Sequence, residues 1–200
     1  MPTTTDRRWN HNTHYHPLAL RLAPSARTAL DVGCGEGRLT RELRDSGVPE
    51  VTGLDVDADQ VARARTAADD DVGLHYLVGD VLRLPTADRF DLVTCYATLH
   101  HLDLEDGLRR LRDLVAPGGH LVVVGLARVG TPVDAVLSLA AVPTAAVADR
   151  ARGHWELGAP VRDPEHTYGD VRRTARRVLS GVQWRRRLYW RYSLIWRAPA

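Results

Sequence analysis

A glycine-rich turn between a predicted strand and a predicted helix constrains this chain more than any other feature. The apolar stretch Thr28–Val32 leads into the sequence GCGEG at positions 33–37, and Leu39–Ser46 then has helical spacing. Glycine lets the backbone turn sharply and lets a ligand approach the main chain. The pattern favours an α/β fold with a nucleotide-type ligand at this turn. A tight structural turn without a ligand is the alternative.

The spacing of the glycines separates two classes of ligand. A dinucleotide fingerprint would place its third glycine at position 38, where this chain has Arg38, and the third glycine is Gly37 instead. A phosphate-binding loop of the P-loop type needs a lysine, and all 27 basic residues here are arginine. Pyrophosphate binding is therefore disfavoured.

Acidic residues end the next two predicted strands. Asp55 is the last residue of the predicted strand Val51–Asp55, and Asp80 comes after Gly79 at the end of the predicted strand Leu74–Val78. Carboxyl ends of parallel strands meet at one edge of a sheet, so we expect Asp55 to accept the hydroxyls of a ribose beside the glycine turn. Asp80 would accept the amino group of adenine, with Val81 against the ring. A turn role is the alternative for Asp80.

The rest of the chain alternates strands and helices. Further strands are predicted at Phe90–Cys95 and His120–Gly125, further helices at Asp57–Asp69, Leu104–Val115 and Tyr168–Leu179, and a terminal antiparallel hairpin at Val182–Tyr189 and Tyr192–Trp196. Asp57 or Asp59 is the expected N-cap of the second helix. The fold class is α/β, with a doubly wound, mostly parallel sheet. We expect an N-terminal arm over residues 1–24, a cofactor-binding core over 25–127, a substrate lid over 128–165 and, over 166–200, a helix and hairpin that complete the sheet.

These motifs, taken in order, resemble one enzyme family. They are Asp31-Val32-Gly33-Cys34-Gly35-Glu36-Gly37, Gly53-Leu54-Asp55, Gly79-Asp80, Phe90-Asp91-Leu92-Val93, Leu99-His100-His101-Leu102 and Pro117-Gly118-Gly119. The chain resembles the class I S-adenosylmethionine-dependent methyltransferases, and is most similar to the small-molecule branch related to the ubiquinone and menaquinone methyltransferases. The resemblance is strong over Thr28–Leu126 and looser over the hairpin.

The resemblance implies a cofactor, a seven-stranded Rossmann-like sheet with an antiparallel last strand, and a set of binding residues. The cofactor is S-adenosyl-L-methionine. Gly33, Cys34, Gly35 and Gly37 would line its methionine part with Asp31 near the ammonium group, Asp55 and Val56 would hold the ribose, Asp80 and Val81 would hold the adenine, and Cys95 would border the transferring methyl group.

The residues on the acceptor side are less clearly marked. Methyl transfer by in-line displacement needs the acceptor to be positioned, and a general base only if the acceptor is protonated. His100 and His101 follow the fourth strand and are candidate bases, although they could instead cap the strand or pack under the cofactor. The arm over residues 1–24 is rich in His and Trp, and we expect it to fold over the cofactor pocket as a lid. Tyr15 or His14 would then approach the reacting groups, and an arm packed on the surface is the alternative. We expect no metal, because no carboxylate or thiolate accompanies the histidines of the arm.

The composition and net charge restrict the location and the partners that this protein can be expected to have. The net charge is only +2, and no apolar N-terminal segment suggests secretion, so we expect a cytoplasmic monomer or homodimer that acts on a small molecule and binds no nucleic acid. The longest apolar run, over residues 133–148, falls short of the about 20 residues of a membrane span. Two alternatives are an RNA methyltransferase, suggested by the arginines of residues 172–187, and a non-catalytic cofactor-binding scaffold.

Overall fold

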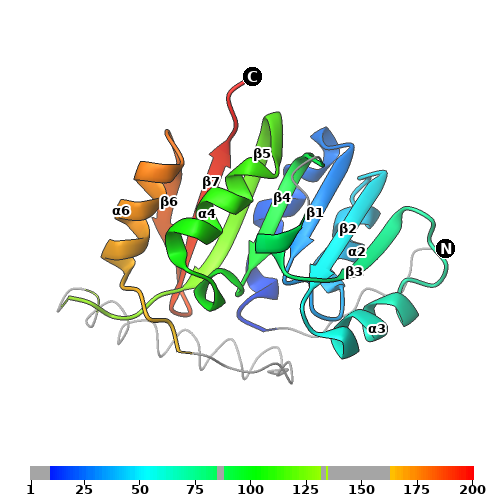
Figure 1. Ribbon diagram of the computed structural model, residues 1–200, viewed down its shortest axis with the longest axis horizontal. Helices are drawn as coiled ribbons and strands as arrows, with labels where there is room; N and C mark the ends of the chain where they lie inside the picture. The colour runs from blue at the N-terminus through cyan, green and yellow to red at the C-terminus, as the bar shows by residue number, and fades with distance from the viewer. Residues whose placement is uncertain (1–9, 85–87, 132–133, 135–162) are drawn as a thin grey trace.

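A seven-stranded sheet forms the centre of the molecule (Figure 1). The computed structural model describes residues 10–84, 88–131, 134 and 163–200. The strands are β1 (Thr28–Val32), β2 (Glu50–Asp55), β3 (Leu74–Val78), β4 (Phe90–Tyr96), β5 (Val115–Leu126), β6 (Gln183–Arg186) and β7 (Arg191–Arg197). Their order is β3-β2-β1-β4-β5-β7-β6, and the first five pair in parallel while β7 runs antiparallel to both of its neighbours. The predicted fold class is confirmed.

Helices cover both faces of the sheet (Figure 1). The helices are α1 (Pro17–Leu20), α2 (Arg38–Asp45), α3 (Ala58–Thr66), α4 (Leu104–Asp113) and α6 (Tyr168–Val178). The apolar side chains of α4 and α6 share one core cluster with the sheet, and those of α1 and α2 share another. The central strands β1, β4 and β5 are therefore largely buried, as their nearly continuous apolar sequences predict, while the edge strand β3 is mostly exposed.

Two local predictions can be compared with the structure directly. Asp57 is the N-cap of α3, and its Oδ1 accepts hydrogen bonds from the backbone N–H groups of Asp59 and Gln60. The last strand of the parallel set begins earlier than the predicted His120, because Val115 pairs with Phe90 before a register shift. That pairing also ends α4 at Asp113, two residues before the predicted end.

The residues predicted to bind a ligand gather at one edge of the sheet, called here the ligand-binding edge. The strands β1, β2, β3 and β4 all end there, and the glycine turn follows the first of them. Arg191 at the start of β7 pairs with Leu126 at the end of β5, so the turn between β6 and β7 reaches the same edge. Residues from both ends of the chain therefore meet beside the glycine turn.

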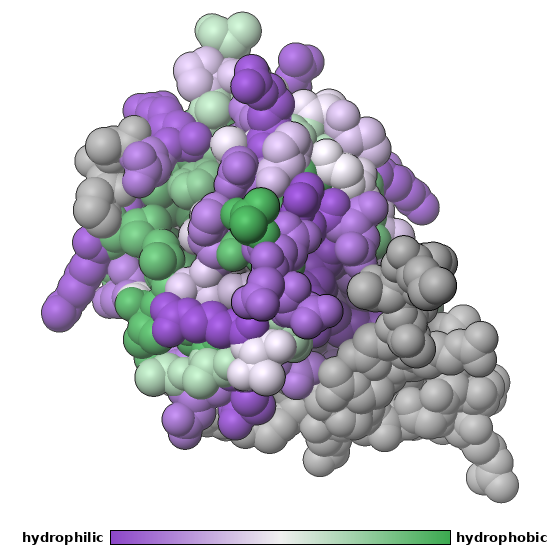
Figure 2. All heavy atoms as spheres, turned by 90° about the vertical axis from the view of Figure 1, so that its right-hand side faces the viewer, coloured by the Kyte–Doolittle hydropathy of each residue, from purple (hydrophilic) through white to green (hydrophobic). Residues whose placement is uncertain are grey.

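The far edge of the sheet is formed by β3. Figure 2 shows the molecule from this side, where hydrophilic residues cover most of the surface and hydrophobic ones form separate patches. At this exposed edge, Nε2 of His75 on β3 lies 2.8 Å from Oε2 of Glu50 on β2.

The lid predicted for residues 128–165 lies mostly outside the described residues, as does the first part of the arm predicted for residues 1–24. Within the part of the chain that is described, no helix is long and apolar enough to cross a membrane.

Candidate active site

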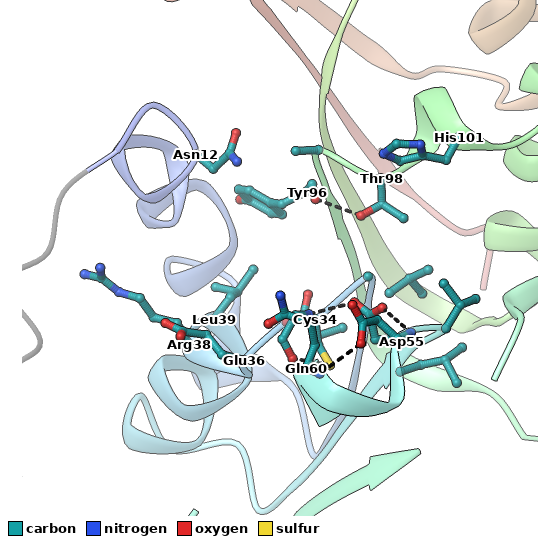
Figure 3. Close-up of a pocket in the computed structure, with 18 of the residues that line it drawn as sticks. Asn12, Cys34, Glu36, Arg38, Leu39, Asp55, Gln60, Tyr96, Thr98 and His101 are labelled. Carbon is teal, nitrogen blue, oxygen red and sulfur yellow. Dashed lines mark hydrogen bonds between the residues drawn. The ribbon is translucent and has the colours of Figure 1, made fainter. Parts of the chain in front are cut away.

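A cavity of about 520 Å³ opens at the ligand-binding edge of the sheet (Figure 3). Its walls come from the arm, the glycine turn, the ends of β2 and β3, and the segment after β4. Of the predicted site residues, those that line it are Asp31, Gly33, Cys34, Gly35, Asp55, Val56, Asp80, Val81 and His101. The structure thus brings together side chains that lie up to 70 positions apart in the chain, from Asp31 to His101.

The glycines of the turn differ in what surrounds them. Gly35 has a φ of +53°, and a Cβ atom built on it would meet nothing nearer than Oε1 of Gln60, at 3.9 Å. A Cβ on Gly33, whose φ is +72°, would lie 1.9 Å from Oγ1 of Thr98. A Cβ on Gly37 would lie 2.6 Å from the ring of Tyr76, and Gly37 does not line the cavity. Only Gly35 therefore presents an open main-chain surface to the cavity.

Asp55 is held in place by the turn that it faces. Its Oδ2 accepts a hydrogen bond of 2.8 Å from the backbone N–H of Gly35, and its Oδ1 accepts one of 3.0 Å from that of Asp57. The side chain is half-buried at the cavity wall. Because a carboxylate oxygen can accept more than one hydrogen bond, Asp55 can still bind hydroxyl groups of a ligand.

The end of β3 supplies a polar and an apolar group together. Asp80 is the N-cap of the short helix Val81–Arg83, and its Oδ1 accepts a hydrogen bond of 2.9 Å from Leu82. Asp80 therefore has the turn role and also lines the cavity. Val81, next to Asp80, is buried, whereas Val56, which also lines the cavity, is 72% exposed. The two valines offer apolar surface suited to a flat ring.

Asp31 lies at the base of the cavity and is only 2% exposed. Its Oδ1 accepts a hydrogen bond of 2.7 Å from Thr94, and its Oδ2 accepts one of 2.9 Å from Thr40. Burial raises the pKa of Asp31, although these two hydrogen bonds oppose the rise. Burial also raises the pKa of the neighbouring Cys34 thiol, which makes a thiolate unfavourable at neutral pH.

The predicted acceptor-side residues separate into two groups. His101 lines the cavity, whereas His100, Tyr15 and Cys95 do not. The Cys95 side chain is fully buried in the core, and the Tyr15 hydroxyl donates a hydrogen bond of 3.0 Å to the carbonyl of Leu188. The Cys95 thiol and the Tyr15 hydroxyl therefore take part in packing, away from the cavity surface.

The segment after β4 has a strained backbone. Ala97 has a φ of +50°, in the left-handed region that is unfavourable for residues other than glycine. It lines the cavity between Tyr96 and Thr98, and the Thr98 hydroxyl donates to the Tyr96 carbonyl. Strain of this kind is concentrated at functional sites.

Four residues of the arm form part of the cavity wall. Asn10, Asn12, Thr13 and His16 all line it. The His16 Nδ1 lies 2.6 Å from Oε2 of Glu42, whose other oxygen accepts a 2.9 Å hydrogen bond from Arg38. Burial alone would raise the pKa of Glu42, but the bonds and charges of His16 and Arg38 outweigh it and lower the pKa. An ionised Glu42 therefore ties the arm to α2.

Sequence reasoning missed several wall residues: Asn12, His16, Gln60, Tyr96 and Thr98. Gln60 carried a usable signal, because it lies four residues before Ala64 and therefore on the face of the helix that is predicted to be buried. A buried polar side chain needs a partner. The other four come from segments whose position depends on the tertiary fold.

No metal centre is evident among the residues with described positions. They contain no group of three or more His, Cys, Asp or Glu side chains that could hold an ion. His11 stacks on Tyr189 with ring centroids 4.6 Å apart, while His16 faces Glu42. The histidines of the arm therefore serve its packing.

Known proteins share both the sequence and the fold. A methyltransferase domain family matches residues 30–123. The uncharacterized methyltransferase Rv0089 of Mycobacterium tuberculosis is 37% identical over 201 residues, covering 97% of this chain and 99% of that protein. A malonyl-[acyl-carrier protein] O-methyltransferase of Enterobacter lignolyticus is 40% identical over 121 residues, covering 58% of this chain and 45% of its own length.

Solved structures agree on the architecture. The PH0226 protein of Pyrococcus horikoshii has a TM-score of 0.69 and 20% identity, with coverage of 99% of this chain and 96% of that one. The N-methyltransferase NodS of Bradyrhizobium japonicum, in complex with S-adenosyl-L-homocysteine, has a TM-score of 0.62 and 20% identity, with coverage of 94% and 87%. The family match, the full-length relative and the fold agree, and this chain belongs to the class I S-adenosylmethionine-dependent methyltransferases.

Proposed function

We propose that this protein transfers the methyl group of S-adenosylmethionine to a small, partly apolar organic acceptor at the cavity. The observation that supports this most directly is the arrangement of Gly35, Asp55 and Asp80. An open main-chain surface, a fixed carboxylate and a second acidic group follow three adjacent strands and line one cavity.

The residues present fit the cofactor. The cavity volume of about 520 Å³ lies within the range of about 300–1,000 Å³ for small-molecule sites. Gly33 and Gly35 would hold the methionine part with Asp31 near its ammonium group, Asp55 and Val56 would hold the ribose, and Asp80 and Val81 would hold the adenine. Bound S-adenosylmethionine supplies an electrophilic methyl group on a sulfonium ion.

The protein's own contribution is chiefly positioning and exclusion of water. Side chains of the arm and of the segment after β4 enclose the same cavity, so an acceptor between them would be held close to the cofactor. His101 is the candidate base for a hydroxyl or amine acceptor. An acceptor that is already ionised at neutral pH, such as a carboxylate, needs no base.

Calorimetry with S-adenosylmethionine tests the cofactor site. Asp55→Ala removes the proposed acceptor of the ribose hydroxyls. Hydrogen bonds to a charged group are worth roughly 1.5–3 kcal/mol, so affinity should fall about ten- to a hundredfold. Asp59→Ala, which changes an exposed carboxylate in the first turn of α3, is the matched control and should bind normally. Unchanged affinity in a folded Asp55→Ala protein would remove the ribose assignment.

Identification of the acceptor needs a transfer assay. The protein is incubated with labelled cofactor and an extract of the producing organism, and methylated products are found by mass spectrometry. Parallel reactions with the RNA fraction address the RNA alternative. Label in the small-molecule fraction supports the proposal, and label in RNA alone contradicts it. Cofactor binding without transfer to any fraction would favour the scaffold alternative.

A further inference from the structure

The turn of the C-terminal hairpin brings two arginines to the ligand-binding edge of the sheet. Arg191 begins β7 opposite the end of β5. The backbone N–H of Arg187 donates a hydrogen bond of 2.8 Å to the carbonyl of Arg191, which places the two residues across the turn from each other. Both side chains are half-buried.

Neither guanidinium group forms an ion pair with any residue in the described part of the chain. Nε of Arg191 donates to Oδ1 of Asn12 at 3.0 Å, and its Nη1 donates to the Tyr189 carbonyl at 3.1 Å. Nε of Arg187 donates to the Ser193 hydroxyl at 2.8 Å. All of these partners are neutral. The neighbouring Arg186 differs, because it forms an ion pair with Asp134.

Placing charge here costs energy. A cation that is partly removed from water is unfavourable unless an anion is close to it. Burial lowers the pKa of Arg191 to about 10, which leaves it charged at neutral pH. Nη2 of Arg191 and both terminal nitrogens of Arg187 make no hydrogen bond to a described residue, so both groups have donors to offer. The missing anion is therefore expected from a ligand.

Neither arginine itself lines the cavity, but residues that are hydrogen-bonded to this turn do. Asn12, which accepts from Arg191, lines the cavity. Tyr96 also lines it, and its hydroxyl donates to the Tyr15 carbonyl, while Tyr15 donates to Leu188 between the two arginines. Figure 3 shows Asn12 and Tyr96 on the arm side of the cavity, away from Asp55. That side is free for an acceptor when Asp55 and Asp80 hold the cofactor.

We propose that the methyl acceptor carries a carboxylate group and that Arg187 and Arg191 bind it. This inference rests on the proposed methyl transfer and adds the chemical class of the acceptor. A guanidinium group matches a carboxylate with paired hydrogen bonds. A carboxylate is preferred to a phosphate because Tyr15, Tyr96 and Tyr189, which pack in one cluster beside the hairpin turn, are buried. A group of charge near −2 is costlier to remove from water in such surroundings than a monoanion.

Calorimetry with simple probes tests this site without knowledge of the natural acceptor. Phenylacetate, its neutral analogue phenylacetamide, and phenyl phosphate are titrated at low salt into protein saturated with S-adenosylhomocysteine. The wild type should bind phenylacetate at least about tenfold more tightly than the amide, as expected for hydrogen bonds between charged groups. Arg187→Gln and Arg191→Gln should each remove that preference. Arg185→Gln, which changes an exposed arginine of the same hairpin, should keep it.

A stability measurement separates binding from a purely structural role. If the role of Arg191 is to bind an anion, the Arg191→Gln protein should unfold at the same temperature as the ligand-free wild type or at a higher one, because the substitution removes an unpaired charge. A less stable Arg191→Gln protein with normal phenylacetate binding overturns the proposal, as do equal affinities of the wild type for acid and amide. A preference for phenyl phosphate over phenylacetate overturns the carboxylate class. Failure to bind S-adenosylhomocysteine contradicts the proposed function itself.

Discussion

Two glycines of one turn are required for different physical reasons, and substitutions should separate them. A side chain at Gly33 would collide with Thr98, so Gly33→Ala should lower the free energy of unfolding by about 1–3 kcal/mol through overpacking. At Gly35 the space is open, so Gly35→Val adds mainly the strain of a positive φ, roughly 1–2 kcal/mol, while its side chain enters the cavity and abolishes cofactor binding.

Urea unfolding and calorimetry on both variants check this contrast. Gly35→Ala provides an intermediate, because it adds the strain with less volume. If Gly35→Val unfolds outright, the glycine is structural. If it binds S-adenosylmethionine as the wild type does, the main chain at Gly35 is not the binding surface.

At the scale of elements, the arm and the C-terminal hairpin act as one unit. His11 stacks on Tyr189, the Tyr15 hydroxyl bonds to Leu188, and Asn12 bonds to Arg191. Deletion of residues 1–16 removes these contacts and the four arm residues that line the cavity, but leaves α1 and the sheet. The truncated protein should therefore fold, bind S-adenosylmethionine weakly and transfer no methyl group.

A transfer assay beside a cofactor titration measures both effects of the deletion. Tyr15→Phe is the control, since it removes one hydrogen bond, worth about 1 kcal/mol, and keeps the arm. It should retain most of the activity. Full activity in the truncated protein would show that the arm has no part in the reaction.

At the scale of the whole molecule, Asp31 links the stability of the core to pH. Because burial raises its folded-state pKa, the folded protein holds this proton more tightly than the unfolded chain. The contribution of Asp31 to stability is therefore largest below the unfolded pKa of about 3.9. This contribution is lost as pH rises towards the folded-state pKa. The Asp31→Asn variant has no carboxyl group to titrate at this position, so its stability should rise relative to that of the wild type as pH increases from about 4.

Urea unfolding of the two proteins between about pH 4 and 8 gives the difference directly, and other titrating groups cancel in it. A difference that does not vary with pH would mean that Asp31 has an ordinary pKa in the folded protein. Circular dichroism confirms that the variant keeps its fold.

Features set by neighbouring residues could be predicted from the sequence alone. The strand, turn and helix around Gly35, the cap at Asp57, the acidic ends of β2 and β3, and the antiparallel hairpin all follow from local spacing, backbone preference and hydrogen bonding. The resemblance to a methyltransferase family depends on the order of these same local motifs. They account for most of the side of the cavity at which the cofactor is proposed to bind.

The side of the cavity proposed for the acceptor was decided by the tertiary structure. Asn12 and Arg191 are 179 positions apart, and Tyr15 and Leu188 are 173 apart, yet each pair is joined by a hydrogen bond. Local spacing cannot indicate such pairs, because they depend on which strands are neighbours and on their register. The same cause placed Cys95 in the core and Gly37 against Tyr76, although the resemblance implied that both would lie at the cofactor. A motif identifies the strand end that meets the ligand, and only side-chain packing between distant segments determines which residues line the cavity.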